Sequence, residues 1–504
     1  MLKTQNVRKT LFAAAATAAL ATAAGPAAAI TPFQSDVGIA IQKGLDWQAA
    51  HNAYNAAATD AAGIALEALL EKRVSGNPAD PPQGYSGASA ADQATMRTSA
   101  LSIINSTNSQ GAGFYAYRDG SRLFALASYA LTGGPDKTTL GSAITLKQAM
   151  DMLTDRTLAK QSTAANYYQG MWDYTGPGSD SSTTQFAAAG LYAAKSFYAS
   201  AKSTPDSGAF ADAVRLGKVN TALALVAAHY KTGGAAGSDN ASCNVLSASE
   251  RGHGYHPLQA GYKPSLQQTA SGIYIQLFGG ADVNDTGVQS YVEWTRNRYR
   301  WQDLDSMGNS WPGYSWSYYL WSSFKAMELL RQSGITPNPG NIGPNDFGTL
   351  PAASAPACVV RQVNKNPATA APAALFGGAA GKYAAEVPGQ YFDYAHELLS
   401  KQCAGLPSGS GGSFTCNGSP GYWDTIAHNA YALLVLQRAT GVIIQRCDVD
   451  GSGTIDRTDI KAIQAAIGTH VGANDVRDAD SDGLLTITDV RQCTLRCTNA
   501  KCAP

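Results

Sequence analysis

The stretch Trp172-Asp173-Tyr174-Thr175-Gly176-Pro177-Gly178-Ser179-Asp180-Ser181-Ser182-Thr183-Thr184-Gln185-Phe186 decides which fold this 504-residue chain adopts. A turn rich in aromatic residues and glycine comes first, Ser and Thr follow, and a helical pattern of Ala, Leu and Tyr begins after them. An Asp or Ser just before a helix is typical of an N-cap, because its side chain accepts hydrogen bonds from backbone N–H groups. The stretch therefore predicts a turn that leads directly into a helix.

The same arrangement of turn and helix recurs along the chain. Its helical parts cover residues 59–70, 121–131, 182–197, 266–278, 316–330 and 425–438. Other helical patterns lie between them, for example at 146–158 and 209–230. Alternating runs of Val, Ile and Thr, which would predict strands, are scarce. The sequence therefore predicts an all-α protein.

The recurrence of this unit also predicts how the helices are arranged. Repeated units bury their apolar faces against their neighbours. Six units with paired helices favour a closed α/α toroid over residues 30–441, with a Pro-, Ala- and Gly-rich excursion at 333–375. Small residues on the recurring helices would let an inner ring pack closely. An open TPR-like array is the alternative, but the tight repeat of about 34 residues that defines it is absent.

Two of these units resemble a known superfamily. Residues 172–186 and 254–272 are similar to repeats of the squalene-cyclase and prenyltransferase superfamily, and the resemblance extends loosely over 35–440. It implies the α/α toroid fold. The Asp-x-Asp-Asp acid of triterpene cyclases is missing, since the nearest string is Asp303-Leu304-Asp305-Ser306, and the body contains no Asp-x-Cys of a prenyltransferase zinc site. Neither activity is therefore expected.

Aromatic residues gather at the starts of the recurring helices, with carboxylates nearby. Flat aromatic faces suit sugar rings, and paired carboxylates can serve as acid and base in glycoside hydrolysis. The predicted ligand-binding residues are Trp172, Tyr174, Trp311 and Trp316, the candidate catalytic acids are Asp173, Asp303 and Asp305, and further aromatics in the same kind of position are Trp301, Tyr314, Tyr318, Tyr319, Trp321, Tyr422 and Trp423. Core packing and helix capping are the commoner roles of such residues. His253, His256 and His428 are expected to be structural groups, and no Ser-His-Asp order stands out.

Two acidic loops lie near the C-terminus, DVDGSGTIDRTD at 448–459 and DADSDGLLTITD at 478–489. Both place oxygen-bearing side chains at loop positions 1, 3, 5, 9 and 12 and a glycine at position 6. Calcium takes six to eight oxygen ligands at roughly 2.3–2.6 Å, and a short loop supplies them through a sharp turn at that glycine. Position 8 is apolar in both loops (Ile455 and Leu485), as expected where two loops pair.

The two loops resemble the type I dockerin, a small EF-hand-type module. Both end in Asp rather than the usual Glu, and only one helix follows each loop. The resemblance implies a dockerin-like module over 447–504, two Ca²⁺ sites and a cohesin-like protein partner. The implied ligands are Asp448, Asp450, Ser452, the Thr454 carbonyl, Asp456 and Asp459 in the first loop, and Asp478, Asp480, Asp482, the Leu484 carbonyl, Thr486 and Asp489 in the second. An acidic turn that binds no metal is the alternative.

The N-terminus and the cysteines both predict export. A basic start, an apolar run over 11–24 and Ala27-Ala28-Ala29 form a secretory signal peptide over 1–29, with no membrane span in the mature protein. The chain is thus expected outside the cell or on its surface, with the periplasm possible. Four cysteines (Cys447, Cys493, Cys497 and Cys502) can form two disulfides in three connectivities, with a zinc site as the alternative. Cys403 and Cys416 are expected to pair; Cys243 and Cys358 are joined or free.

Charge and composition exclude one class of partner. The chain carries 37 basic and 37 acidic residues, so it lacks the basic surface that nucleic-acid binding requires. Two functions remain. The first is a secreted calcium-binding protein that binds a ligand or glycan in the toroid and a protein partner through the dockerin-like module. The alternative is a secreted polysaccharide-degrading hydrolase or lyase on the same scaffold.

Overall fold

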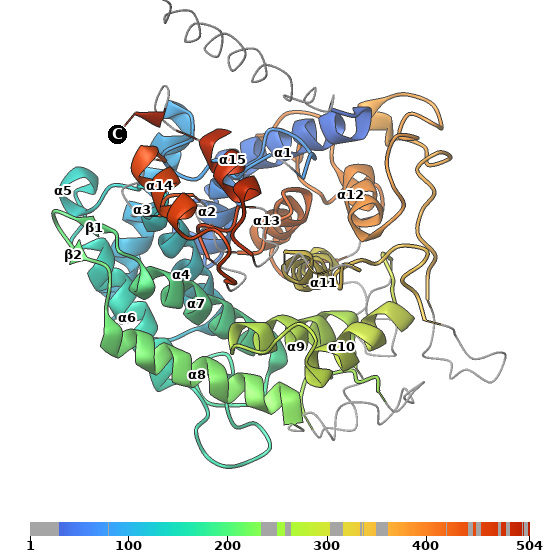
Figure 1. Ribbon diagram of the computed structural model, residues 1–504. Coiled ribbons are helices and arrows are strands. Elements are labelled where there is room, and N and C mark those ends of the chain that lie inside the picture. The colour runs from blue at the N-terminus through green and yellow to red at the C-terminus, as the bar shows by residue number, and fades with distance from the viewer. Residues whose placement is uncertain are drawn as a thin grey trace, which may run out of the picture.

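The computed structural model contains almost only helices (Figure 1). It describes residues 30–78, 80–232, 249–257, 264–302, 316–332, 335, 337–348, 361–419, 421–441, 447–449, 455–471, 475–479, 484–495, 497 and 502–503. Within them lie fifteen α-helices, a short 3₁₀ helix (Ala374–Phe376) and one two-stranded hairpin. The predicted all-α class is therefore confirmed. The signal peptide over 1–29 lies outside the described residues.

Six helices form the centre of the body. They are α2 (Ala62–Leu70), α4 (Ala116–Leu131), α7 (Ser181–Ala199), α9 (Leu266–Phe278), α11 (Trp316–Arg331) and α13 (Thr425–Leu436). Each contacts the next in this order and α13 contacts α2, so the six helices make a closed circuit. All nine residues of α2 are buried, which fits a helix that has neighbours on every side. The six correspond to the six units in the sequence.

A second set of helices surrounds this circuit, as Figure 1 shows. These are α1 (Pro32–Ala50), α3 (Ala90–Gln110), α6 (Leu146–Ala159), α8 (Ala213–Thr232), α10 (Thr286–Asn297) and α12 (Gln390–Lys401). The chain alternates between outer and inner helices, so each outer helix returns it to the end where the next inner helix begins. Minor elements are α5 (Lys137–Leu140) and the hairpin of β1 (Ser203–Thr204) and β2 (Gly208–Ala209), in which Ser203 faces Ala209.

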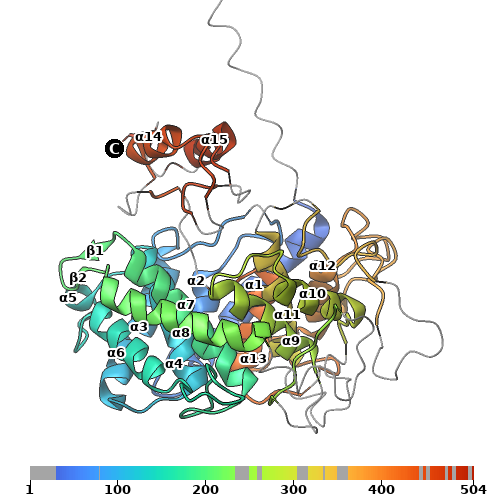
Figure 2. The ribbon, with the colours of Figure 1, turned by 60° about the horizontal axis from the view of Figure 1, so that its bottom comes forward.

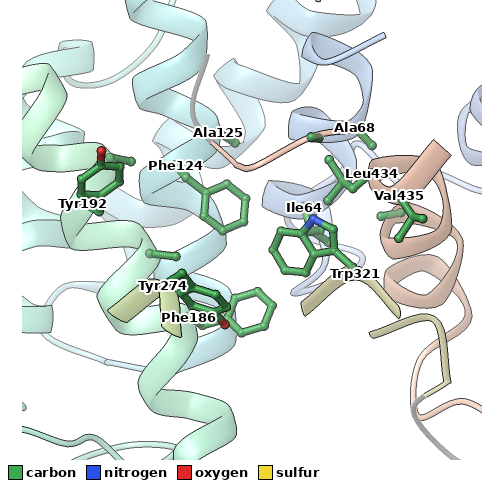
Figure 3. Close-up of a cluster of buried hydrophobic side chains, with 14 of the residues drawn as sticks. Ile64, Ala68, Phe124, Ala125, Phe186, Tyr192, Tyr274, Trp321, Leu434 and Val435 are labelled. Carbon is green, nitrogen blue, oxygen red and sulfur yellow. The ribbon is translucent and has the colours of Figure 1, made fainter. Parts of the chain in front are cut away.

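Aromatic side chains fill the middle of the circuit. Phe124, Phe186 and Trp321 point toward one another from α4, α7 and α11, and Ile64 and Leu434 close the cluster from α2 and α13 (Figure 3). The ring centroids of Phe186 and Trp321 are 6.0 Å apart. The centre is therefore a packed core, and any cavity has to lie toward one end of the helices.

Small residues set the distance between inner helices. A Cβ at Gly120 of α4 would lie 2.3 Å from the Phe186 carbonyl oxygen of α7, and one at Gly190 would lie 2.9 Å from the Gly120 Cα. These helices therefore touch through their backbones. By contrast, a Cβ at Gly217 of the outer helix α8 meets nothing within 4 Å.

A separate, smaller unit follows the body. It contains α14 (Arg457–Ala465) and α15 (Ile487–Leu495), which stand apart at one end of the body in Figure 2. The unit has its own apolar cluster, made of Cys447, Ile455, Ile460, Ile463, Ala479, Val490 and Cys493. Lys202, just beyond the end of α7, forms an ion pair of 2.8 Å with Asp448 and so links the body to this unit.

Three disulfides bridge the described cysteines: Cys403–Cys416, Cys447–Cys493 and Cys497–Cys502. This confirms the predicted 403–416 pair and selects one of the three connectivities left open for the last four cysteines. Disulfides persist in oxidising environments. Cys243 and Cys358 lie outside the described residues. Over the described part of the chain, no helix is both long and apolar enough to cross a membrane.

The α4–α7 contact gives a first prediction. Gly120→Ala should lower the free energy of unfolding by about 1–3 kcal/mol, because the new methyl group overlaps backbone atoms that cannot move independently. Gly217→Ala is the matched control and should be neutral or stabilising by up to about 1 kcal/mol, because alanine favours helix more than glycine does. Chemical denaturation followed by circular dichroism measures both. Equal effects would contradict the backbone contact.

Candidate functional site: a tyrosine-lined cavity and two acidic loops

A cavity of about 650 Å³ lies where the six inner helices begin. Its wall includes one residue from the first turn of each, namely Ile64, Tyr117, Ser182, Gln268, Ser317 and Ala427. The alternation of outer and inner helices explains this convergence, because every inner helix starts at the same end. The small C-terminal unit follows the far end of α13 and therefore lies on the opposite side of the body from the cavity.

Tyrosine dominates the wall of the cavity. Eight of the chain's 24 tyrosines line it: Tyr115, Tyr117, Tyr174, Tyr255, Tyr318, Tyr319, Tyr422 and Tyr431. Tyr115 stacks with Tyr174 at a centroid distance of 6.2 Å, and Tyr318 stacks with Phe186 at 6.0 Å. Trp423 also lines the cavity and is 73% exposed, so it stands at the mouth. The wall thus combines flat apolar faces with hydroxyl groups.

Asp180 accepts hydrogen bonds that position the side chains on one side of this wall. It caps α7 by accepting the backbone N–H groups of Ser182 and Thr183 at 2.8 and 2.9 Å. The Ser182 hydroxyl donates to one Asp180 oxygen at 2.5 Å, and the Tyr255 hydroxyl donates to the other. Tyr117 in turn donates to Ser182 at 2.7 Å. The network fixes the orientation of three hydroxyl groups that face the cavity.

Burial raises the pKa values of the groups in this network. Desolvation raises the pKa of Asp180, and it holds the pKa of Tyr117 well above its usual value. The pKa of Tyr174 is also raised, first by burial. The phenols therefore remain protonated near neutral pH, and their oxygens can accept hydrogen bonds from a ligand. Aromatic faces and hydroxyl groups together favour a hydroxyl-rich ligand on this side of the wall.

A serine and a histidine meet on another side of the cavity. Ser317, the second residue of α11, places its Oγ 2.8 Å from Nδ1 of His428 on α13. The other ring nitrogen of His428 lies 3.1 Å from the Phe414 carbonyl oxygen. Both side chains are buried and both line the cavity. From the sequence, His428 is expected to be a structural group. Nothing in the sequence pattern indicates this contact, because the two residues are 111 positions apart.

Among the predicted ligand-binding and catalytic residues, one lines the cavity, others lie away from it, and the rest fall outside the described residues. Tyr174 lines the cavity, and its hydroxyl lies 3.0 Å from that of Tyr255. Trp172 and Trp316 are buried; the Trp172 Nε1 donates to the Thr157 carbonyl at 2.8 Å, and neither indole is among the lining residues. Asp173 accepts the Tyr174 N–H at 2.7 Å within the turn, away from the cavity wall. Asp303, Asp305 and Trp311 lie outside the described residues.

The acids that line the cavity among the described residues are Asp424, which directly precedes α13, and Asp60, which lies two residues before α2. One oxygen of Asp424 accepts the Ala427 N–H at 2.7 Å and thereby caps α13. The sequence signal that could have found the wall is the position of polar and aromatic residues in the first turn of each recurring helix. The direction of each side chain, however, depends on the neighbouring helices.

The two acidic loops share one hydrogen-bond pattern. In the first, Asp459 accepts the N–H groups of Val449 and Asp456 at 2.6 and 2.9 Å. In the second, Asp489 accepts those of Ala479 and Thr486, both at 2.7 Å. The side chain at loop position 9 also accepts the N–H two residues later in both, at 2.6 and 3.0 Å. The described parts of the loops therefore fold alike.

The chemistry of these loops suits a cation, although part of the predicted ligand set is not described. Asp448, Asp456, Asp459, Asp478 and Asp489 are all buried in this small unit. Gathering buried carboxylates is costly unless cations compensate them. Asp450, Ser452, Thr454, Asp480 and Asp482 lie outside the described residues, and the remainder contains no group of three acidic, His or Cys residues placed to hold a metal. Leu484 and Leu485 pair through the backbone with residues 468–470.

No family model, no curated protein and no solved structure matches this chain. The cavity and the two acidic loops are therefore the features that bear on its function.

The segment that carries Tyr255 gives a second prediction. His253 anchors this segment, and burial lowers the pKa of His253 to about 3. An unfolded histidine has a pKa of about 6.5, so below pH 6.5 the unfolded state binds a proton that the folded state does not. His253 therefore costs stability as the pH falls, and the cost at pH 5 amounts to ~2 kcal/mol relative to pH 7.

Thermal unfolding of the wild type and of His253→Gln at both pH values isolates this contribution from those of the other titrating groups. The wild type should lose more stability than the variant between pH 7 and pH 5. His51→Gln, at a half-buried histidine outside this segment, serves as the control for the substitution itself. Identical pH dependence in the wild type and His253→Gln would contradict the neutral buried form.

Proposed function

We propose that this chain is a secreted α/α-toroid protein that binds a neutral carbohydrate in the tyrosine-lined cavity and a protein partner through a calcium-loaded, dockerin-like C-terminal module. The single observation that supports ligand binding is the cavity wall itself, with eight tyrosines and hydroxyl groups in fixed orientations. Ligand pockets commonly span about 300–1,000 Å³, and this volume falls within that range. The closed circuit of inner helices supports the toroid.

The wall matches the chemistry of a sugar better than that of an ion. A sugar ring has an apolar face that packs on an aromatic side chain, and its edge carries hydroxyl groups that need partners. Tyr174 and Trp423 offer exposed aromatic faces, while Ser182 and Tyr255 offer oriented hydroxyls. Phenols kept protonated by burial add no charge to the wall.

The calcium proposal rests on the duplicated loops. The groups that would hold the ions are the side chains of Asp448, Asp450, Ser452, Asp456, Asp459, Asp478, Asp480, Asp482, Thr486 and Asp489 with the carbonyls of Thr454 and Leu484. Ca²⁺ would neutralise carboxylates that the fold buries. Because the module leaves the body at the end opposite the cavity, a cohesin-like protein bound there would leave the cavity open.

The alternative, a polysaccharide-degrading enzyme, needs two carboxyl groups about 5–9.5 Å apart across the substrate. Asp60 and Asp424 both line the cavity and keep this alternative open. Asp424, however, already serves as the cap of α13. We therefore prefer ligand binding to glycoside hydrolysis as the proposed function. Release of reducing ends from a bound glycan would reverse this preference.

Ligand binding is tested at the mouth of the cavity. Trp423→Ala removes an exposed aromatic face from the wall and should weaken binding of a soluble neutral glycan about tenfold or more, in line with a contact worth 1–3 kcal/mol. Tyr167→Ala is the control, since Tyr167 is an exposed aromatic residue (43%) that does not line the cavity. A glycan array identifies the ligand and calorimetry measures both variants. Equal affinities, or no glycan bound by the wild type, would reject the proposal.

Calcium binding is tested separately. Calorimetry should find two Ca²⁺ ions per chain, and Asp459→Ala and Asp489→Ala should each remove one of them, because position 12 closes each loop. Asp475→Ala changes an acid between the loops and should retain both ions. A chelator should lower the melting temperature of the C-terminal module. Unchanged melting together with no heat of binding would exclude the metal.

A further inference from the structure

Neither ligand binding nor calcium explains the contact between Ser317 and His428. The Ser317 Oγ and His428 Nδ1 are 2.8 Å apart, and both residues belong to the cavity wall. Nucleophilic enzymes share this arrangement: a hydroxyl within hydrogen-bond reach of a base that a third group holds in place.

The polarity of the pair follows from its third partner. The His428 Nε2 faces the Phe414 carbonyl oxygen at 3.1 Å, and a carbonyl oxygen can only accept a hydrogen bond. A neutral imidazole carries one proton, which must therefore sit on Nε2. Nδ1 is then the acceptor, and the Ser317 hydroxyl donates its proton toward it. This is the orientation in which a histidine can act as the base for a serine.

The imidazole is neutral and fixed in position. Burial lowers the pKa of His428 to about 4, so the ring can accept a proton at neutral pH. Its ring packs against Tyr422 at a centroid distance of 5.1 Å. A histidine of low pKa is a weak base, which suits an ester, whose alcohol leaves more readily than the amine of an amide.

The disulfide between Cys403 and Cys416 supports the third group of this arrangement, the Phe414 carbonyl. Phe414 lies inside the loop that this disulfide closes, and its side chain is fully buried. Two backbone hydrogen bonds, Cys403 N–H to the Ser413 oxygen at 2.8 Å and Gly412 N–H to the Cys403 oxygen at 2.9 Å, hold the same loop. The orienting carbonyl is thus carried by a cross-linked segment. Ser317 itself is on a helix, so all three groups have rigid supports.

We propose that Ser317, His428 and the Phe414 carbonyl form a catalytic unit that hydrolyses an uncharged carboxylic ester bound in the cavity, such as an O-acyl group on a neutral carbohydrate. The choice of carbohydrate rests on the proposed function, whereas the reactivity of Ser317 does not. The wall of tyrosine rings and hydroxyl groups accommodates an ester, which carries no charge. Tyr318 and Tyr319 follow Ser317 on α11 and line the same cavity, and the Tyr318 hydroxyl donates to the Ser182 carbonyl at 3.3 Å.

The reaction balances with water as the only co-reactant. Ser317 Oγ attacks the ester carbonyl carbon while its proton passes to His428 Nδ1, giving a tetrahedral species. The bond to the alkoxy oxygen then breaks, and the proton on Nδ1 leaves with the alcohol. Water next attacks the acyl-serine and gives its proton to Nδ1. Release of the carboxylic acid returns that proton to Ser317.

The direct test uses the whole protein and a fluorophosphonate probe. Intact-mass and peptide analysis should find one label, on Ser317, and p-nitrophenyl acetate should be hydrolysed. Ser317→Ala should abolish both signals, and His428→Gln should lower the rate about a hundredfold or more. Ser290→Ala is the matched control, because Ser290 is a buried serine of the outer helix α10 that does not line the cavity, and it should keep the wild-type rate.

Each result of these experiments either supports or overturns the proposal. Absence of label on Ser317 of the folded wild type, or an unchanged rate in Ser317→Ala, overturns the proposal. If a variant melts well below the wild type, the probe result on the wild type still stands as the deciding measurement. Glycan binding is measured independently on Ser317→Ala. Labelling of Ser317 without glycan binding rejects only the carbohydrate as ligand. Glycan binding without labelling rejects only the esterase proposal.

The positioning role of the disulfide loop has its own readout. Replacing both cysteines in Cys403→Ser/Cys416→Ser should lower kcat about tenfold and leave KM for the ester within about twofold, because the base loses its fixed orientation while the cavity wall remains. A bridge that merely stabilises the fold would lower Tm without changing kcat of the folded fraction. That result would remove the Phe414 loop from the catalytic unit.

Discussion

Closure of the inner helices into a circuit is the constraint on which the rest of this structure depends. An inner helix contacts two inner neighbours and the packed centre, so it has almost no solvent-facing side. Its close contacts require small residues, and at Gly120 the α4 backbone leaves no room for a Cβ. Polar groups on these helices must find partners inside, as the Ser128 hydroxyl does by donating to Glu67 at 3.0 Å. Only the ends of the helices remain free to form a site.

The cavity is a direct consequence of that closure. Because outer helices return the chain, all six inner helices present their first turns at one end. First turns are where side chains such as Asp180 cap the backbone, and the same caps orient hydroxyl groups toward the cavity. Burial raises the pKa values of Asp180 and Tyr117. The capping chemistry that begins the helices thus also produces a hydroxyl-rich wall, and the Ser317–His428 pair joins the first turns of two helices in it.

The C-terminal unit is stabilised in a different way from the body. It is too small to be stabilised by its core alone and uses two disulfides, Cys447–Cys493 and Cys497–Cys502, together with buried carboxylates arranged alike in two loops. Its attachment at the far ends of the inner helices, with the Lys202–Asp448 ion pair across the junction, separates it from the cavity. The proposed partner contact and the proposed ligand site therefore lie on opposite sides of the molecule.

The sequence by itself determined the features that are local in the chain. Recurring turns and helical patterns located the six inner helices, loop spacing identified two equivalent acidic loops, and proximity predicted the Cys403–Cys416 pair. Only the tertiary structure decided what faces the cavity. Trp172 carries the strongest aromatic signal yet points into the core, where Thr157 accepts its N–H, while Tyr174 two residues later reaches the wall. Ser317 and His428 meet although 111 residues separate them. Helix periodicity is set by neighbouring residues, whereas the direction of a side chain and its partners depend on how distant helices pack.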